Sequence, residues 1–206
     1  MPAKNKHRLF WAYCCISAVF FAAGCTSADM PKPWGYFRID LPDKQYTGFD
    51  TTYPYCFRYP AYARIMPKTD SLAEPYWINI QFPSFKGTIH LSYKPVRGNL
   101  PEYLEDARAM VMKHIPKADA IGETLINRPE DKVYGMVYDI RGSDAASPIQ
   151  FFLTDSLRHF IRGALYFYVK PNNDSLSPVI AFLKQDIDTL VGSFHWEKEP
   201  DNRRHK

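Results

Sequence analysis

Cysteine is scarce in this chain, and its placement excludes a disulfide framework. The 206 residues include four cysteines; Cys14 and Cys15 lie in an apolar N-terminal run, and Cys25 follows it. If these three belong to an export signal and its processing site, Cys56 has no cysteine left to pair with. The fold must then be held together by its hydrophobic core. Cys56 stands in an apolar pattern, so we expect a buried, inert thiol; a nucleophile would need a lowered pKa.

An excess of charge of one sign is also absent. The sequence has 26 Lys and Arg against 22 Asp and Glu, and three of the cations, Lys4, Lys6 and Arg8, lie in the first 24 residues. Without that segment, 23 cationic residues face 22 anionic ones, which does not support a nucleic-acid partner. The basic cluster in residues 199–206 is short, so we expect a solvated tail.

Motifs for catalysis and metal binding are missing as well. The sequence contains no HExxH, GxSxG, GxxxxGKS, GxxxxGKT or CxxC pattern. After the first 24 residues, the histidines have no spacing typical of metal ligands; they are His90, His114, His159, His195 and His205. We therefore expect no catalytic residue, no metal ion and no cofactor.

Long hydrophobic runs are limited to one stretch near the N-terminus. Residues 9–23 are apolar and follow a positively charged start. This run is shorter than the ~20 residues of a membrane-spanning helix and fits the apolar region of an export signal. The segment Ala22-Ala23-Gly24-Cys25 then matches a lipobox. We predict a lipoprotein signal over residues 1–24 and a lipid on Cys25; the alternatives are an ordinary secreted protein and an uncleaved anchor.

Proline and glycine divide the remaining chain into a lead-in and a domain. Residues 25–52 contain breakers that disfavour a helix: Pro31, Pro33, Gly35, Pro42 and Gly48. We predict a lipid-anchored tether and extended lead-in there, with the aromatic stretch 31–42 docked on the domain. Residues 53–198 then form a single domain, long enough for a sizeable core, and 199–206 form the basic tail.

Alternating and β-branched patterns predict strands through most of this domain. In residues 76–82, for example, Ile78, Ile80 and Phe82 would share one face of a strand. The loop PSFKG joins this strand to residues 88–93 as a hairpin. Further strands are predicted over residues 55–59, 62–66, 120–127, 133–140, 149–154, 159–169 and 193–196.

Two helices interrupt the strands. The first is predicted from the cap Asn99, with Glu102 in a capping box, to Pro116; its apolar stripe is Leu104, Ala107, Met110 and Val111. The second is predicted from the cap Ser177, with Pro178 at the first helical position, to Gly192. Its apolar face is Val179, Leu183, Ile187, Leu190 and Val191.

This order of elements predicts an α+β fold, in which an antiparallel β-sheet is packed by two main helices. Long hairpins and few crossovers favour antiparallel pairing over the parallel sheets of the α/β class. The succession from FRYP at residues 57–60, through both helices, to SFHW at residues 193–196 is similar to the Mog1/PsbP-like sandwich.

Three groups of residues could carry chemistry, and each also has an ordinary structural interpretation. The segment Asp155-Ser156-Leu157-Arg158-His159 pairs a hydroxyl with an imidazole, but Asp and Ser are usual turn residues between strands. Aromatic residues such as the edge-like Tyr166-Phe167-Tyr168 could form a protein-binding surface, although core packing accounts for most of them. Charges around the loop 141–148 could bind a carboxylate or a glycan, or form weak surface pairs: Asp139, Arg141, Asp144, Arg158 and Arg162.

Several longer blocks are specific enough to indicate a family. They are FRIDLP (37–42), FPSFKGTIHLSY (82–93) and QFFLTDSLRHFIRGALYF (150–167). With these blocks, residues 31–196 closely resemble the gliding motility lipoprotein GldD family of Bacteroidetes. The resemblance implies an envelope lipoprotein needed for gliding motility and linked to type IX protein secretion. It implies no catalytic motif, and only the lipidated cysteine carries over, onto Cys25.

The resulting hypothesis is a non-enzymatic lipoprotein that binds or stabilises other gliding and type IX secretion components of the envelope. Acylated Cys25 would hold it in the outer membrane, and a strand edge or an aromatic patch would contact the partner. Asp29 can accompany surface export in this phylum, but one Asp gives thin support, so we expect the periplasmic face. The alternative is an envelope enzyme, or a small-ligand or glycan binder, centred on Asp155, Arg158 and His159.

Overall fold

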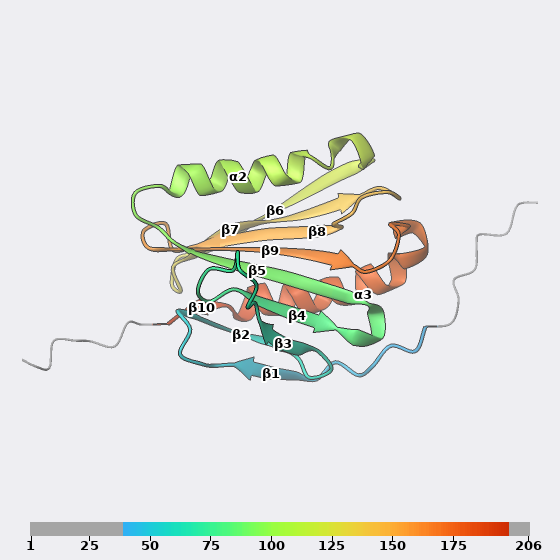
Figure 1. The fold of residues 1–206 in the computed structure, drawn as a ribbon, viewed down its shortest axis with the longest axis horizontal. Helices are drawn as coiled ribbons and strands as arrows, with labels where there is room; N and C mark the ends of the chain where they lie inside the picture. Colours follow the sequence, from blue (N-terminus) through green and yellow to red (C-terminus); the bar gives the residue numbers. More distant parts are fainter. Residues whose placement is uncertain (1–38, 198–206) are drawn as a thin grey trace, which may run out of the picture. The chain divides into compact units, whose positions relative to one another are not determined.

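The computed structural model describes residues 39–197, shown in colour in Figure 1. Its long helices are α2 (Leu100–Met112) and α3 (Asn173–Ser193), and short 3-10 turns cover Pro83–Phe85 and Ile115–Lys117. Its strands are β1 (Tyr46–Phe49), β2 (Tyr55–Pro60), β3 (Arg64–Pro67), β4 (Ile78–Phe82), β5 (Gly87–Pro95), β6 (Ala120–Arg128), β7 (Val133–Arg141), β8 (Ile149–Thr154), β9 (His159–Phe167) and β10 (His195–Trp196).

These strands form two sheets. Within the described residues, the larger sheet has seven strands in the order β3-β4-β5-β9-β8-β7-β6, and the smaller has three in the order β1-β2-β10. Every pairing between neighbouring strands is antiparallel. The predicted α+β class, with antiparallel pairing and two main helices, is therefore confirmed.

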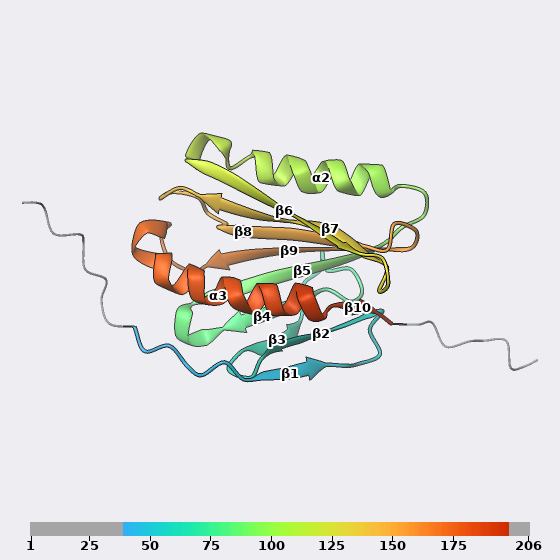
Figure 2. The same cartoon turned by 180° about the vertical axis from the view of Figure 1, so that it is seen from behind.

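The two helices lie on opposite faces of the large sheet, as the front and back views show (Figures 1 and 2). The small sheet shares the face of α3, because Phe57 of β2, Ile89 of β5 and Leu183 of α3 belong to one buried cluster. On the other face, α2 places Ala107 and Val111 against β7 and β9 in two smaller clusters. The main core therefore lies between the large sheet on one side and α3 with the small sheet on the other.

The hydrophobic patterns explain this arrangement. In β4, Ile78, Ile80 and Phe82 are each at most 1% exposed, as the alternation predicts, because every second side chain of a strand faces the same side. The predicted apolar face of α3 is also confirmed: Val179, Leu183, Ile187, Leu190 and Val191 are all buried. Both faces belong to the main core cluster.

The predicted start of α3 is wrong. The helix begins at Asn173, so Pro178 lies inside it, and the capping residue is Asn172, whose side chain accepts a hydrogen bond from Ser175 N–H. The Asn173 side chain also donates to the Gly142 carbonyl at 2.8 Å and the Ala145 carbonyl at 2.9 Å. These contacts with a distant loop hold an additional helical turn, which a local pattern could not indicate.

The predicted capping box of α2 is also wrong, although the helix begins after Asn99 as expected. The Asn99 side chain makes no cap hydrogen bond; its Oδ1 accepts from Arg97 N–H at 2.9 Å instead. The apolar stripe is narrower than predicted, because Ala107 and Val111 are buried whereas Met110 is 41% exposed. α2 thus contacts the sheet along a thin strip of small and branched side chains.

A buried carboxylate joins the first described residues to α3. Asp186 is 2% exposed, and its Oδ1 accepts hydrogen bonds from Lys44 Nζ at 2.7 Å and the Tyr46 hydroxyl at 2.8 Å. Its Oδ2 accepts from the hydroxyl of Tyr62. Lys44 Nζ also lies 3.6 Å from the centroid of the Phe182 ring. Asp186 therefore connects the lead-in, β1 and the segment after β2 to one helix.

Tyr62 reaches this carboxylate because β3 starts later than predicted. A strand was expected over residues 62–66, but a turn closed by Ala63 N–H and the Pro60 carbonyl at 2.9 Å precedes it, and β3 begins at Arg64. Burial and the Asp186 carboxylate raise the pKa of Tyr62, so its hydroxyl remains a proton donor. The turn thus supplies the third donor to Asp186.

Replacing Asp186 by alanine should lower the free energy of unfolding by about 3 kcal/mol, because a buried ion pair loses one member and two tyrosine hydroxyls lose their acceptor. Urea unfolding of the purified chains measures this loss. Asp188→Ala is the matched control, since its side chain on the same helix is 57% exposed. It should cost less than about 0.5 kcal/mol, and equal losses in the two variants would contradict the role given to Asp186.

Candidate functional site

The predicted lipidation site, Cys25, and the nearby Asp29 lie outside the described residues. Neither helix within residues 39–197 combines the length and apolar character needed to cross a bilayer.

The predicted catalytic alternative, Asp155 to His159, forms the turn between β8 and β9. Asp155 is buried, and its Oδ1 accepts from the backbone N–H groups of Leu157 at 3.0 Å, Arg158 at 2.7 Å and His159 at 2.8 Å. Burial alone would raise the pKa of Asp155, but these backbone hydrogen bonds outweigh it and the pKa lies below its ordinary value. Ser156 adopts a left-handed conformation with φ of 69°, as turn residues often do. The structure thus favours the turn interpretation.

His159 is buried beside aromatic side chains. Its Nδ1 lies 2.8 Å from the Tyr93 hydroxyl, and its ring stacks on Trp196 with centroids 5.1 Å apart. Because Asp155 Oδ1 is occupied by three backbone donors, that oxygen is committed to the turn. The contacts of His159 connect β5, β9 and β10, which is a structural role.

The charged residues around the loop 141–148 do not form one group. Asp139 and Arg141 make a pair at 3.7 Å at the end of β7, whereas Arg158 lies in the β8–β9 turn at the opposite end of β8. Arg162 lies within β9 and donates to Gln150 Oε1 at 2.5 Å. The predicted carboxylate or glycan site would require charges that converge, but Arg158 is separated from the Asp139–Arg141 pair by the length of β8, and the Arg162 guanidinium is bonded to Gln150.

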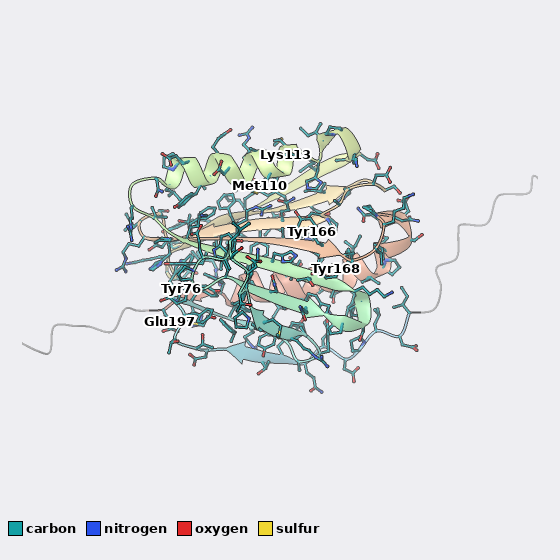
Figure 3. The ribbon with its side chains drawn as sticks, in the orientation of Figure 1. Tyr76, Met110, Lys113, Tyr166, Tyr168 and Glu197 are labelled. Carbon is teal, nitrogen blue, oxygen red and sulfur yellow. The ribbon has the colours of Figure 1, made fainter. Side chains whose placement is uncertain are left out.

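The aromatic segment 166–168 ends an interior strand of the sheet and does not belong to an edge strand, although Tyr166 and Phe167 extend past β8 and pair with β5 alone. β9 lies between β5 and β8 in the interior of the large sheet. The Tyr166 ring packs near His90, with centroids 5.6 Å apart, and Phe167 packs against the main core. Tyr168, which follows β9, is 65% exposed; Figure 3 labels both tyrosines at that end of the strand. A pattern of aromatic residues cannot distinguish a central strand from an edge.

The two edges of the large sheet differ strongly. β3 is four residues long and ends at Pro67, which has no N–H to donate to another strand. β6 is nine residues long and contains no proline; it pairs with β7 along its whole length. Within residues 39–197, no strand pairs with its other side. β6 is therefore the edge with the chemistry to accept a further strand.

A groove of about 550 Å³ lies beside this edge. It runs between β6 and the C-terminal half of α3, and its lining residues are Thr124, Leu125, Ile126, Asn127, Arg128, Val137, Lys184, Asp188, Val191 and Gly192. Val137 and Val191 are buried at its base, whereas Leu125 is 69% exposed. Arg128 holds one end of the groove, because its guanidinium donates to the carbonyls of Gly192 and Phe194.

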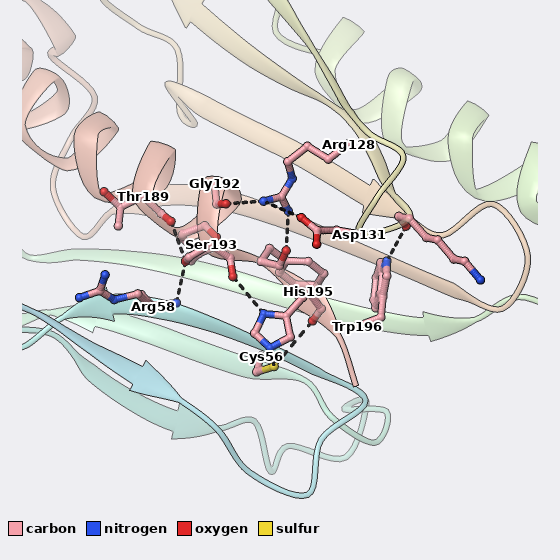
Figure 4. Close-up of polar contacts among 12 residues, drawn as sticks. Cys56, Arg58, Arg128, Asp131, Thr189, Gly192, Ser193, His195 and Trp196 are labelled. Carbon is pink, nitrogen blue, oxygen red and sulfur yellow. Dashed lines mark hydrogen bonds and ion pairs between the residues drawn. The ribbon is translucent and has the colours of Figure 1, made fainter. Parts of the chain in front are cut away.

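A second group of side chains lies where β10 meets β2 (Figure 4). Cys56 Sγ is 2.6 Å from His195 Nε2 and 2.8 Å from Glu197 Oε1. Cys56 is 3% exposed, as predicted; burial, reinforced by Glu197, raises the pKa of its thiol to about 12. The thiol is therefore protonated at neutral pH and would be a poor nucleophile.

Sequence reasoning missed this group, because the spacing between cysteine and histidine gives no signal when they are 139 residues apart. The one local indication is the alternation of His195 and Glu197, which places both side chains on the same face of a short strand. Cys56 joins His195 and Glu197 only through the register of β10 against β2, which places Cys56 opposite His195.

Replacing Asp155 by alanine should cost about 2 kcal/mol of stability at pH 7, because three backbone N–H groups of the turn, among them the buried N–H of His159, lose their acceptor. Since the folded pKa is lowered from 3.8, this contribution is present above that pH and is lost as the pH falls below it. Urea unfolding at pH 7 and pH 3 measures both effects, with the exposed Asp144→Ala as control. A fully stable Asp155→Ala chain that lost its function would instead support the catalytic alternative.

A comparison with protein families agrees with the family expected from the sequence. The chain is similar to the solution structure of cyanobacterial PsbP (CyanoP) from Synechocystis, with 13% identity and a TM-score of 0.45 over 78% of this chain and 98% of that chain. No curated protein matches. The model of the family described as gliding motility lipoprotein GldD matches residues 26–196. Because this match covers most of the chain, the protein belongs to the gliding motility lipoprotein GldD family.

Proposed function

We propose that this protein is a non-enzymatic accessory of the gliding and type IX secretion machinery, anchored by a lipid on Cys25, which binds an extended segment of another envelope protein along β6. Family membership supports the general part of this proposal, namely that the protein is a lipoprotein with a role in gliding motility. The exposed β6 edge is the observation that supports a binding role.

Strand addition suits this edge for physical reasons. An added strand would pair with the outer backbone N–H and C=O groups of β6, which gives affinity that is largely independent of sequence. Its side chains would alternate, so that every second one enters the groove over Val137 and Val191. Lys184 and Asp188, 3.7 Å apart on α3, provide both charge signs at the rim. The fitting partner is therefore an extended, mainly apolar segment with polar residues that flank its centre.

Lipid attachment would raise the effective concentration of β6 near partners in the same membrane. Two or more acyl chains hold a protein stably in a bilayer, which restricts it to diffusion in two dimensions. A partner in the same membrane then meets β6 at a raised effective concentration, so a weak strand contact is sufficient. The favoured location is the periplasmic face of the outer membrane.

An enzyme is the less favoured function. The group that would have to perform catalysis, Asp155 to His159, is a turn in which the carboxylate is bonded to backbone N–H groups.

Loss of the lipid should abolish function without loss of the folded domain. A deletion strain complemented with Cys25→Ala should not recover colony spreading or its secreted proteome, although immunoblots show a normal amount of protein. Cys15→Ala is the matched control, because this cysteine lies within the predicted signal; it should complement fully. Full complementation by a soluble Cys25→Ala chain would contradict the tether.

A charge introduced into the groove should block strand addition. Thr124 is exposed and lines the groove, so Thr124→Lys should reduce spreading to nearly the level of the deletion strain. Glu123→Lys is the matched control, because successive side chains of a strand point to opposite faces and Glu123 does not line the groove. Equal complementation by both variants, at equal abundance, would exclude the β6 groove as the binding site.

The same pair of variants tests whether β6 pairs with β6 of a second copy of this chain. If the purified chain sediments as a dimer that Thr124→Lys dissociates and Glu123→Lys does not, β6 pairs with itself. That result would replace the envelope partner with a homodimer.

A further inference from the structure

Backbone pairing between β2 and β10 brings together three side chains that are distant in the sequence. Cys56 lies directly opposite His195, and Glu197 N–H donates to the Pro54 carbonyl at 3.0 Å, which continues the pairing. His195 Nε2 and Glu197 Oε1 are 4.0 Å apart, and each lies within 2.8 Å of Cys56 Sγ. In the part of the chain that the structure describes, this is the one group of three such ligands within 4.8 Å of one another.

The imidazole is already oriented as a ligand. His195 Nδ1 lies 3.2 Å from the Ser193 carbonyl, so a proton on Nδ1 is bonded and the Nε2 lone pair is directed at Cys56 and Glu197. Ser193 is itself held, because its hydroxyl accepts from Arg58 N–H at 2.8 Å and donates to the Thr189 carbonyl at 2.7 Å (Figure 4). Metal-binding histidines commonly have such a carbonyl behind the ring, which determines the tautomer.

We propose that Cys56, His195 and Glu197 bind a zinc ion, with water as the fourth ligand. Thiolate, imidazole and carboxylate are the three side-chain ligands that zinc prefers. Tetrahedral coordination requires about 3.5 Å between ligand atoms. The two separations from Sγ, 2.6 and 2.8 Å, are shorter than this and the Nε2–Oε1 separation of 4.0 Å is longer, so the exposed His195 and Glu197 side chains would shift by up to about 1 Å on binding. On binding, the Cys56 thiol releases its proton to solvent as the S–Zn bond forms.

The surroundings admit a cation and a water molecule. The side chains of His195 and Glu197 are 57% and 39% exposed, so one side of the site is open to solvent. Asp50 and Glu197 both place negative charge near Cys56, and a divalent cation would neutralise it. The residues involved are distinct from those of the β6 groove.

Zinc at this position would fasten the last described strand. β10 is two residues long and pairs with β2 alone, so few backbone hydrogen bonds hold it. An ion bound by Cys56 of β2, by His195 of β10 and by Glu197, which follows β10, would join both segments through coordinate bonds. If zinc binds the folded chain and not the unfolded chain, it would also raise the stability of the folded chain by mass action.

The test uses the full chain in detergent, with Cys14, Cys15 and Cys25 replaced by serine so that Cys56 is its single cysteine. Competition with a chromophoric chelator measures zinc affinity, and thermal unfolding with and without zinc chloride measures linkage. We expect one zinc per chain and a higher Tm with zinc. His195→Gln and Glu197→Gln should each weaken binding at least about tenfold and abolish the Tm shift.

Controls separate coordination from folding. His114→Gln, between α2 and the 3-10 turn Ile115–Lys117, should keep the affinity of the parent chain. Cobalt substitution should give a thiolate-to-cobalt absorption band that Cys56→Ser removes. Because Cys56 is buried, Cys56→Ser could unfold the chain; in that case the affinities of His195→Gln and Glu197→Gln, at exposed positions, decide whether the site binds metal. Absence of stoichiometric binding, or unchanged affinity in both His195→Gln and Glu197→Gln, would overturn the proposal. Neither result depends on gliding, so the proposed function is tested independently.

Discussion

The buried carboxylate of Asp186 is the constraint on which the arrangement of α3 depends. A carboxylate with so little access to water is stable only if nearby donors replace its hydration. Lys44, Tyr46 and Tyr62 supply those donors, and each comes from a different place in the first part of the described chain. The hydrogen bonds to Asp186 therefore hold the lead-in, β1 and the turn before β3 against the same helix, α3. The small sheet follows, because β1 pairs with β2.

The position of α3 in turn determines both candidate sites. Its C-terminal half forms one wall of the groove beside β6, and its last turn leads through Phe194 into β10. Arg128 of β6 bonds to the Gly192 and Phe194 carbonyls, which would otherwise be unsatisfied at a helix end. The edge strand thus caps the helix that borders its own groove. A shift of α3 would change the width of the groove and the register that places His195 opposite Cys56.

Much of the fold could be predicted from the sequence, because the side chains that an element buries recur at the period of a strand or a helix. The alternation of Ile78, Ile80 and Phe82 and the apolar face of α3 both required only a pattern within one element. The start of α3 could not be predicted, since Asn173 is held by the distant loop that contains Ala145. The same reason applies to the sites. Cys56 looked like an isolated core thiol, and only pairing across 139 residues shows its neighbours; likewise, strand order, which makes β6 an edge, is a property of the whole sheet.

The two proposals rest on different kinds of chemistry at neighbouring places. Strand addition at β6 would use backbone groups, which every partner segment possesses, so selectivity must come from the groove and from confinement to one membrane. Zinc at Cys56, His195 and Glu197 would use three specific side chains, so its selectivity is intrinsic to the ligand set. The ion would hold β10, whose preceding residue Phe194 accepts the hydrogen bond from Arg128 that closes the groove. Metal binding would therefore stabilise the end of the helix against which a partner strand lies, without contact with that strand.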